Sequence, residues 1–134
     1  IAEMVAELLE KAGLKLTENK NFNPIRKPAH AFREASIEEK NRMIKENPSY
    51  GKIVCRCETV TEGEILEAIR TNPKPRDLDG VKRRTRAQMG RCQGGFCGPQ
   101  IVEMLAKELG IAYEDVTKFG GNSVMNVGKT KDGE

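Results

Sequence analysis

Four cysteines, arranged as two close pairs, are the residues of this chain best suited to chemistry. One residue separates Cys55 from Cys57, four separate Cys92 from Cys97, and 34 residues lie between the pairs. On an extended backbone the side chains at i and i+2 point to the same side, so the first two thiolates can reach one metal centre. Two glycines inside the second pair let the backbone fold around an ion without Cβ clashes. The spacing predicts that the four sulfurs converge on one metal site.

Both pairs stand just before a predicted helix, one starting near Thr61 and the other near Pro99. A helix N-terminus carries unpaired N–H groups and a partial positive charge, so it suits an anionic group. The stretch 73–91 adds positive charge, because it holds seven basic and two acidic residues in a chain whose net charge is only +3. A dianionic [2Fe–2S] cluster on four cysteines would account for the ligands, the helix ends and the charge together. We expect the basic stretch, including Lys82, Arg83 and Arg84, to support this cluster or its partner electrostatically.

Other interpretations of the cysteines stay open at this point. Structural zinc also takes four cysteines, although a pair with one intervening residue lies outside its usual spacing. Two disulfides need an oxidising compartment, and Cys55 and Cys57 are poorly placed to bridge each other on a strand. Four buried, inert cysteines are a third possibility. The basic stretch can also be a solvated helix face, and it holds no aromatic residue that would stack on bases, which argues against nucleic acid.

The elements before the first cysteine pair are predicted to be helical, with one irregular segment. Residues 2–12 have apolar side chains at helical spacing, and Gly13 follows as a natural stop. Residues 14–34 lack periodicity and form a connector. Ser36, with a glutamate three residues on, opens a second helix that ends before Pro48. Residues 52–57 are predicted to be extended.

Three further helices are predicted around the second cysteine pair, and a fourth, short one after them. Thr61, again followed by a glutamate three residues on, caps the first of them. Asp79 is expected to cap a short basic helix. Pro99 opens a helix that ends at Gly110, and the last short helix is expected near Glu114. The apolar side of the Pro99 helix is predicted to consist of Ile101, Val102, Leu105 and Leu109.

Composition narrows the class of protein. Aromatic residues make up 4% of the chain and tryptophan is absent, so few large side chains are available to stabilise the fold by apolar burial. A bound metal is a candidate for the additional stabilisation that the fold needs. No apolar run approaches the ~18 residues of a membrane span. The chain begins with Ile1 and shows no leader, so we expect it to be a piece of a longer protein.

Three runs of sequence resemble the bacterioferritin-associated-ferredoxin-like [2Fe–2S]-binding domain, in the form found at the C-terminus of FAD-dependent glycerol-3-phosphate dehydrogenases of the anaerobic type. The runs are residues 50–58, 81–86 and 89–99, and the resemblance covers about residues 50–118. It implies that the four cluster ligands are Cys55, Cys57, Cys92 and Cys97. It also implies a mainly α fold, with helix-turn-helix pairs around a four-cysteine site. Gln88 stands where the resemblance leads us to expect glycine.

The resemblance further implies a division of the chain and a role for it. Residues 1–34 are expected to be the last helix of a preceding flavin domain and its connector, residues 35–118 the cluster domain, and residues 119–134 a flexible tail. The implied role is electron transfer from the flavin domain of the parent chain to an acceptor protein or subunit, with a structural zinc-binding or docking domain as the alternative. A Gly-rich dinucleotide fingerprint is absent here, so FAD and catalysis are expected in the parent enzyme and not in this piece.

The implied surroundings are those of a cytoplasmic enzyme. Neither nucleic acid nor a transmembrane segment is expected, and any attachment to the membrane periphery would be made through partner subunits.

Overall fold

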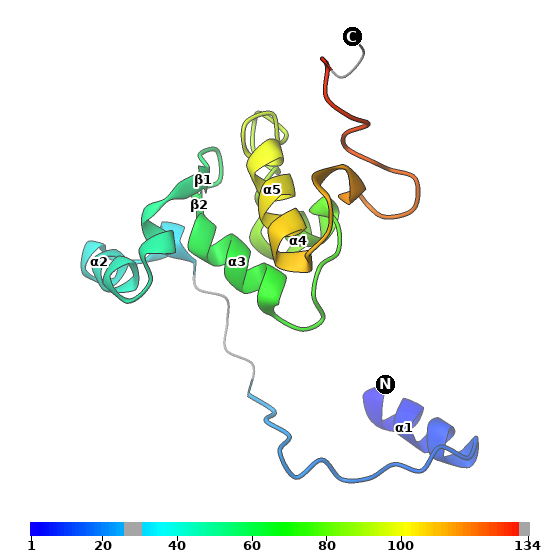
Figure 1. Ribbon diagram of the computed structural model, residues 1–134. Coiled ribbons are helices and arrows are strands. Elements are labelled where there is room, and N and C mark those ends of the chain that lie inside the picture. Colours follow the sequence, from blue (N-terminus) through cyan, green and yellow to red (C-terminus); the bar gives the residue numbers. More distant parts are fainter. Residues whose placement is uncertain (26–30, 132–134) are drawn as a thin grey trace.

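The structure is a computed structural model that describes residues 1–25 and 31–131 (Figure 1). The described elements are, in chain order, α1 (Ala2–Lys11), the 3-10 helix η1 (Phe32–Glu34), α2 (Ile37–Glu46), the 3-10 helix η2 (Pro48–Gly51), β1 (Ile53–Cys55), β2 (Val60–Thr61), α3 (Glu62–Arg70), α4 (Leu78–Thr85), α5 (Cys97–Leu109) and the 3-10 helix η3 (Tyr113–Asp115). The short strands β1 and β2 pair antiparallel, with Ile53 opposite Thr61 and Cys55 opposite Val60. The mainly α fold class is confirmed.

The apolar core lies where α3, α4 and α5 pack together (Figure 1). Its fully buried side chains include Ile65 and Ile69 of α3, Val81 of α4, and Ile101 and Leu105 of α5. Burying such a side chain contributes about 1.5–3 kcal/mol, so these contacts fix the three helices relative to one another. Because α5 also contacts β1, the core holds the start of α5 beside the end of β1.

The two predicted capping signals at Ser36 and Thr61 are confirmed. Ser36 Oγ accepts a hydrogen bond of 3.2 Å from the Glu39 N–H at the start of α2. At α3 the exchange is reciprocal, because Thr61 Oγ1 accepts from the Glu64 N–H at 3.2 Å and Glu64 Oε2 accepts from the Thr61 N–H at 2.7 Å. This capping box begins α3 directly after β2.

The predicted cap of α4 is wrong by two residues. Asp77, not Asp79, caps the helix, and its Oδ1 accepts a hydrogen bond of 2.6 Å from the Gly80 N–H. Asp79 lies in the first turn of α4, where its carboxylate pairs with the ammonium group of Lys118. The backbone N–H of Leu78 donates to Thr117 O at 3.1 Å, so the chain after α5 also stabilises this helix end.

A second, smaller apolar cluster joins η1, α2 and η2 to α3. Phe32, Met43 and Tyr50 are its buried members, and the Phe32 and Tyr50 rings stack with centroids 6.4 Å apart. The Phe32 N–H donates to Glu64 Oε1 at 3.0 Å, and the Tyr50 hydroxyl donates to Glu67 Oε2 at 2.8 Å. Residues 32–34 therefore pack on the folded unit, although the sequence analysis assigned them to the connector.

Helix α1 lies apart from this folded unit at the end of an extended segment (Figure 1). None of its residues is buried, and its apolar side chains Val5, Leu8 and Leu9 are 43–55% exposed. The helix predicted over 2–12 is confirmed over 2–11. The remainder of the predicted connector is irregular where it is described, and residues 26–30 lie outside the described part of the chain.

The chain after α5 folds back on itself. The Lys118 N–H donates to Ser123 O at 2.7 Å, and the Met125 N–H donates to Val116 O at 3.3 Å. Val116 is fully buried in the core, so this segment is attached to the folded unit up to about residue 125. No helix in the ranges 1–25 and 31–131 is both long and apolar enough to cross a membrane.

Candidate metal centre

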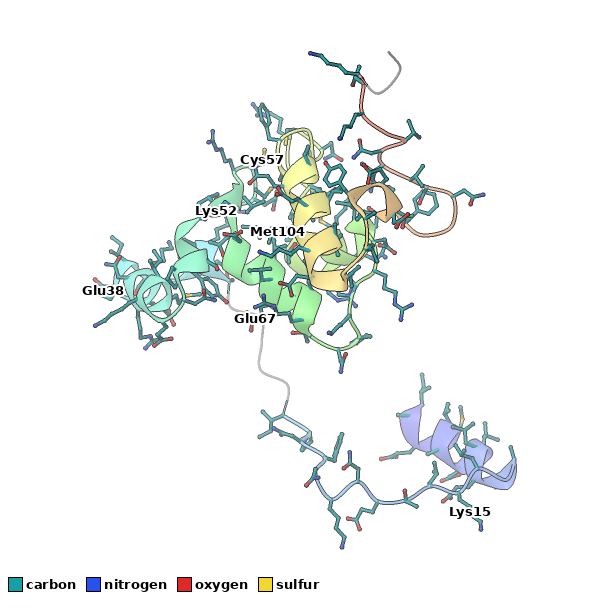
Figure 2. The ribbon with its side chains drawn as sticks, viewed as in Figure 1. Lys15, Glu38, Lys52, Cys57, Glu67 and Met104 are labelled. Atoms are coloured by element: carbon teal, nitrogen blue, oxygen red, sulfur yellow. The ribbon has the colours of Figure 1, made fainter. Side chains whose placement is uncertain are left out.

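The four cysteines line one cavity of about 320 Å³ next to the helical core. Cys55 is the last residue of β1 and Cys97 the first of α5, and each is 1% exposed. Cys57 lies exposed in the turn after β1, and Cys92 lies half-buried in the loop before α5. Figure 2 shows Cys57 beside the loop that precedes α5. Two elements fixed by the core thus bring one buried and one accessible thiol each to the same cavity.

The sulfurs are paired across the two sequence motifs. Cys57 Sγ and Cys92 Sγ lie 3.6 Å apart, and the Cys55 thiol is close enough to Cys97 to help raise the pKa of the Cys97 thiol. The expected reason for convergence is therefore wrong in part, since β1 ends at Cys55 and Cys57 lies in a turn rather than further along the strand. All four are free thiols. Within the described residues, no set of three or more His, Cys, Asp or Glu side chains is arranged to hold a single metal ion.

The accessible and buried thiols differ in their electrostatic surroundings. The backbone N–H groups of Phe96 and Gly94, followed by the Cys57 thiol, hold the pKa of the Cys92 thiol below its usual value. Burial, together with the neighbouring Cys55, raises the pKa of the Cys97 thiol to about 11, while the Gln88 backbone N–H acts in the opposite direction. The surroundings of Cys92 thus favour its thiolate, whereas those of Cys97 favour its neutral thiol.

The loop that carries Cys92 is shaped by residues with positive φ. Gln88, Gln93 and Gly94 have φ of +73°, +50° and +91°. The Gly98 N–H then donates to Gly94 O at 2.7 Å, which joins the loop to the first turn of α5. The helix was predicted to start at Pro99, but α5 starts two residues earlier, at Cys97. Pro99 therefore lies within its first turn. Because Cys97 is the first residue of α5, its sulfur lies at the N-terminal, partially positive end of the helix.

The rim of the cavity is basic and aromatic. Arg56, Arg91 and Phe96 complete its lining, and the Phe96 side chain is 80% exposed. Arg91 is the member of the basic stretch 73–91 that lines the cavity. Arg84, by contrast, donates to the backbone carbonyl of Pro73 at 2.7 Å, and Arg83 lies 3.9 Å from Asp77 Oδ1. These two cations therefore contact α4 and the segment before it, and they do not line the cavity.

Two residues that shape this site were not identified in the sequence. Glu58 follows Cys57 and accepts a hydrogen bond of 3.1 Å from Arg86 Nε, which joins the first cysteine turn to the end of α4. Gly90 lies against Cys57. A signal for Gly90 was present in the Gly-Arg-Cys run, whereas nothing local marks Glu58 as a partner of a residue 28 positions away.

Fold and site together define a small helical domain with a four-cysteine centre. Residues 53–107 match the family described as BFD-like [2Fe-2S] binding domain, and this part of the chain is such a domain. That family is described as binding a [2Fe-2S] cluster, and the four cysteines of this chain line one cavity. The family boundaries coincide with β1 at one end and with the last turn of α5 at the other.

Several curated proteins are similar to the chain. A glycerol 3-phosphate dehydrogenase from Caloramator mitchellensis is 46% identical over 131 residues, which cover 98% of this chain and 27% of that protein. A subunit of the anaerobic glycerol-3-phosphate dehydrogenase of Haloferax volcanii is 45% identical over 56 residues, covering 42% of this chain and 9% of that protein. An opine oxidase subunit of Rhizobium meliloti is 40% identical over 68 residues, which cover 50% of this chain and 12% of that protein.

The chain thus spans about a quarter or less of the length of these relatives. No solved structure gives a significant match to it.

Proposed function

We propose that Cys55, Cys57, Cys92 and Cys97 hold the [2Fe–2S] cluster, and that this domain passes single electrons between a flavin and an acceptor. The observation that carries the proposal is the convergence of all four thiols on one cavity from two motifs 34 residues apart. Four cysteine thiolates are the usual ligand set of such a cluster. The 3.6 Å between Cys57 Sγ and Cys92 Sγ is close to the separation of two thiolate ligands on one tetrahedral metal ion.

The chain's own residues give the site an inner and an outer side. When bound, the cluster supplies a reversible one-electron couple. Cys55 and Cys97 are attached to the buried core side, whereas Cys57 and Cys92 face the mouth of the cavity. Electron exchange with a partner is therefore expected through the mouth, where the protein layer is thinnest.

The rim indicates the chemistry of that partner. Arg56 and Arg91 place two positive charges at the mouth, and the exposed Phe96 ring adds an apolar contact. Opposite charges steer association and orient it, so the docking partner is expected to present acidic groups around an apolar centre. We assign this face to transient contacts with the flavin domain of the parent chain and with the electron acceptor.

The parent protein is proposed to be a FAD-dependent glycerol-3-phosphate dehydrogenase. Support comes from the relative named glycerol 3-phosphate dehydrogenase, which is similar along almost the whole of this chain and not only along the cluster domain. Shorter similarity extends to the opine oxidase protein, so the domain is shared by oxidoreductases named for different substrates. Substrate binding, FAD and catalysis accordingly belong to the parent, and this piece is a carrier of electrons.

The boundaries of the cluster domain follow from its packing. We propose a folded unit from about residue 32 to about residue 125, rather than 35–118. Phe32 is buried against Tyr50 at one end, and Met125 is hydrogen-bonded to Val116 at the other. Helix α1 then belongs to the preceding flavin domain.

Anaerobic purification of the full chain tests the proposal. We expect a reddish-brown protein that contains iron and acid-labile sulfide in equal amounts and that bleaches on reduction. Replacing any one of the four cysteines by serine is expected to lower the iron content and alter the visible spectrum. A colourless protein that contains stoichiometric zinc and shows no redox couple would instead establish the structural zinc-binding or docking domain.

A further inference from the structure

Gln88 is a buried polar residue directly behind the cysteine loop. The residue is 6% exposed. Its backbone N–H is hydrogen-bonded to the Cys97 sulfur. Its side chain lies against Gly94, because Cγ and Oε1 would stand 3.3 Å from a Cβ added at that glycine. Gln88 therefore lies between Cys97 and the Gly94 segment of the loop.

The side-chain nitrogen of Gln88 has no hydrogen-bond partner. Within the described part of the chain, its Nε2 is a buried side-chain atom that no donor or acceptor satisfies. Leaving a buried amide unpaired costs about 1–3 kcal/mol, and native proteins rarely accept this cost without a reason. Gln88 also adopts a φ of +73°, a conformation that favours glycine. A glutamine at this position is thus unfavourable on two counts unless something else binds its amide.

We propose that Gln88 tunes the reduction potential of the site by donating a hydrogen bond from Nε2 to a sulfur of the cluster or of its thiolate ligands. This inference rests on the proposed function. Cys97 is the ligand we assign to it, since the backbone N–H of Gln88 already acts on the Cys97 thiol. Hydrogen bonds to sulfur favour the reduced state, which carries one more negative charge, and so raise the reduction potential.

Two variants of the full chain separate the amide from the rest of the residue. Gln88→Gly removes the side chain and suits the positive φ, so the loop is expected to keep its shape. Gln88→Met keeps a side chain of similar length and lacks the N–H donor. Gln100→Met is the matched control, because it removes the same amide from an exposed position on α5 that does not line the cavity.

The measurement is an anaerobic redox titration followed by visible absorbance, on proteins with equal iron content. We expect both Gln88 variants to be reduced less readily, by about tenfold in the equilibrium constant, which corresponds to about 59 mV for a one-electron couple. Gln100→Met should titrate with the wild type. Gln88→Gly should also leave the cluster-free protein at least as stable to urea as the wild type, since a purely structural role for the side chain predicts the opposite.

Three results would overturn the proposal: wild-type potentials in both Gln88 variants, an equal shift in Gln100→Met, or loss of the cluster from Gln88→Gly while the wild type retains it. A wild-type chain without visible absorbance has a different meaning, because it contradicts the proposed function itself.

Discussion

The backbone at Gly90 passes directly against Cys57. A Cβ atom added to Gly90 would overlap Cys57 Cβ, and it would stand 3.4 Å from the Cα and carbonyl carbon of the same residue. Two non-bonded carbon atoms cannot tolerate this overlap, and the obstructing atoms belong to the backbone and Cβ of Cys57 rather than to a flexible side-chain end. The turn that carries Cys57 and the loop that carries Cys92 can therefore approach only because residue 90 has no side chain.

Gly90→Ala is expected to separate the two motifs and impair the metal centre. The methyl group must push Cys57 away from Cys92, whose sulfurs now lie 3.6 Å apart. We expect the purified variant to contain less than half of the wild-type iron and to lose the rest faster in air. Gly51→Ala is the control, since its added Cβ would make an ordinary contact of 3.5 Å with Ile44. Equal iron content in Gly90→Ala and wild type would show that the loops can move apart without cost.

The convergence of the cysteines was predictable because part of its cause is local. The spacing of the pairs and the glycines of the second loop are visible in the sequence, whereas the packing of α3, α4 and α5 that brings the two motifs together is not. The two capping signals were predictable for the same reason, since a cap involves residues only three positions apart. The way the sulfurs pair was not, because it depends on where β1 ends and on β2, a strand of two residues that is too short to show periodicity.

The cap of α4 shows how a distant contact decides between equivalent local signals. Asp77 and Asp79 are both acceptable caps in sequence. The N–H groups of Leu78 and Asp79 instead donate to the carbonyl groups of Thr117 and Lys118, at 3.1 and 2.9 Å, and the Asp79 carboxylate pairs with Lys118. A segment almost 40 residues later thus places Asp79 inside the helix, and no local pattern could indicate this.

Reversing the charge of the rim is expected to slow electron exchange. In the parent enzyme, the double variant Arg56→Glu and Arg91→Glu should lower the rate of electron transfer to or from the domain by about tenfold at low salt, because an acidic partner is then repelled. The difference should shrink as ionic strength rises, since salt screens these exposed charges. Stopped-flow absorbance at the cluster measures the rate.

The matched control for the rim is the double variant Arg42→Glu and Lys45→Glu on α2. It makes the same change in net charge at residues that do not line the cavity. An equal slowing by both double variants would point to overall charge, and the proposed docking face would then be wrong.

An ion pair between α3 and α5 is expected to make stability depend on pH. Arg70 donates to both carboxylate oxygens of Glu108, at 2.7 and 2.6 Å, and these bonds hold the pKa of Glu108 below its usual value. Because the pKa of Glu108 is lower in the folded state, the ion pair stabilises the fold fully at pH values above the unfolded-state pKa of about 4.3. This stabilisation is lost as the pH falls through the folded-state pKa of Glu108. Arg70 is largely exposed, so Arg70→Met should cost only about 0.5 kcal/mol at neutral pH.

Urea unfolding at several pH values measures this contribution. The wild type and Arg70→Met should differ at neutral pH and converge well below about pH 4, where Glu108 is protonated in both states. Arg42→Met, which removes the more exposed pair with Glu39 within α2, is expected to change stability less. A constant difference between wild type and Arg70→Met down to the lowest pH would mean that Arg70 acts by packing and not by charge.

Two truncations are expected to behave differently although they differ by only four residues. Removing residues 1–30 deletes α1, which has no buried residue, and leaves Phe32 in place against Tyr50. Removing residues 1–34 also deletes Phe32, its stacking on Tyr50 and its hydrogen bond to Glu64. We expect the first truncation to match the full chain in urea midpoint and visible absorbance. The second should lose about 3 kcal/mol, the usual cost of removing a buried phenylalanine.

The substitution Phe32→Ala in the full chain separates the lost side chain from the shortened backbone. It should reproduce most of the destabilisation of the longer truncation, because Phe32 is the buried residue among residues 31–34. The site is expected to survive in Phe32→Ala, since the Phe32 cluster shares no residue with the lining of the cysteine cavity. The longer truncation also removes Arg33, which lies 3.9 Å from Glu58 Oε2 beside the first cysteine turn. If the shorter truncation already lost stability or the cluster, α1 would have to pack on the domain in solution, and the boundary at about residue 32 would be wrong.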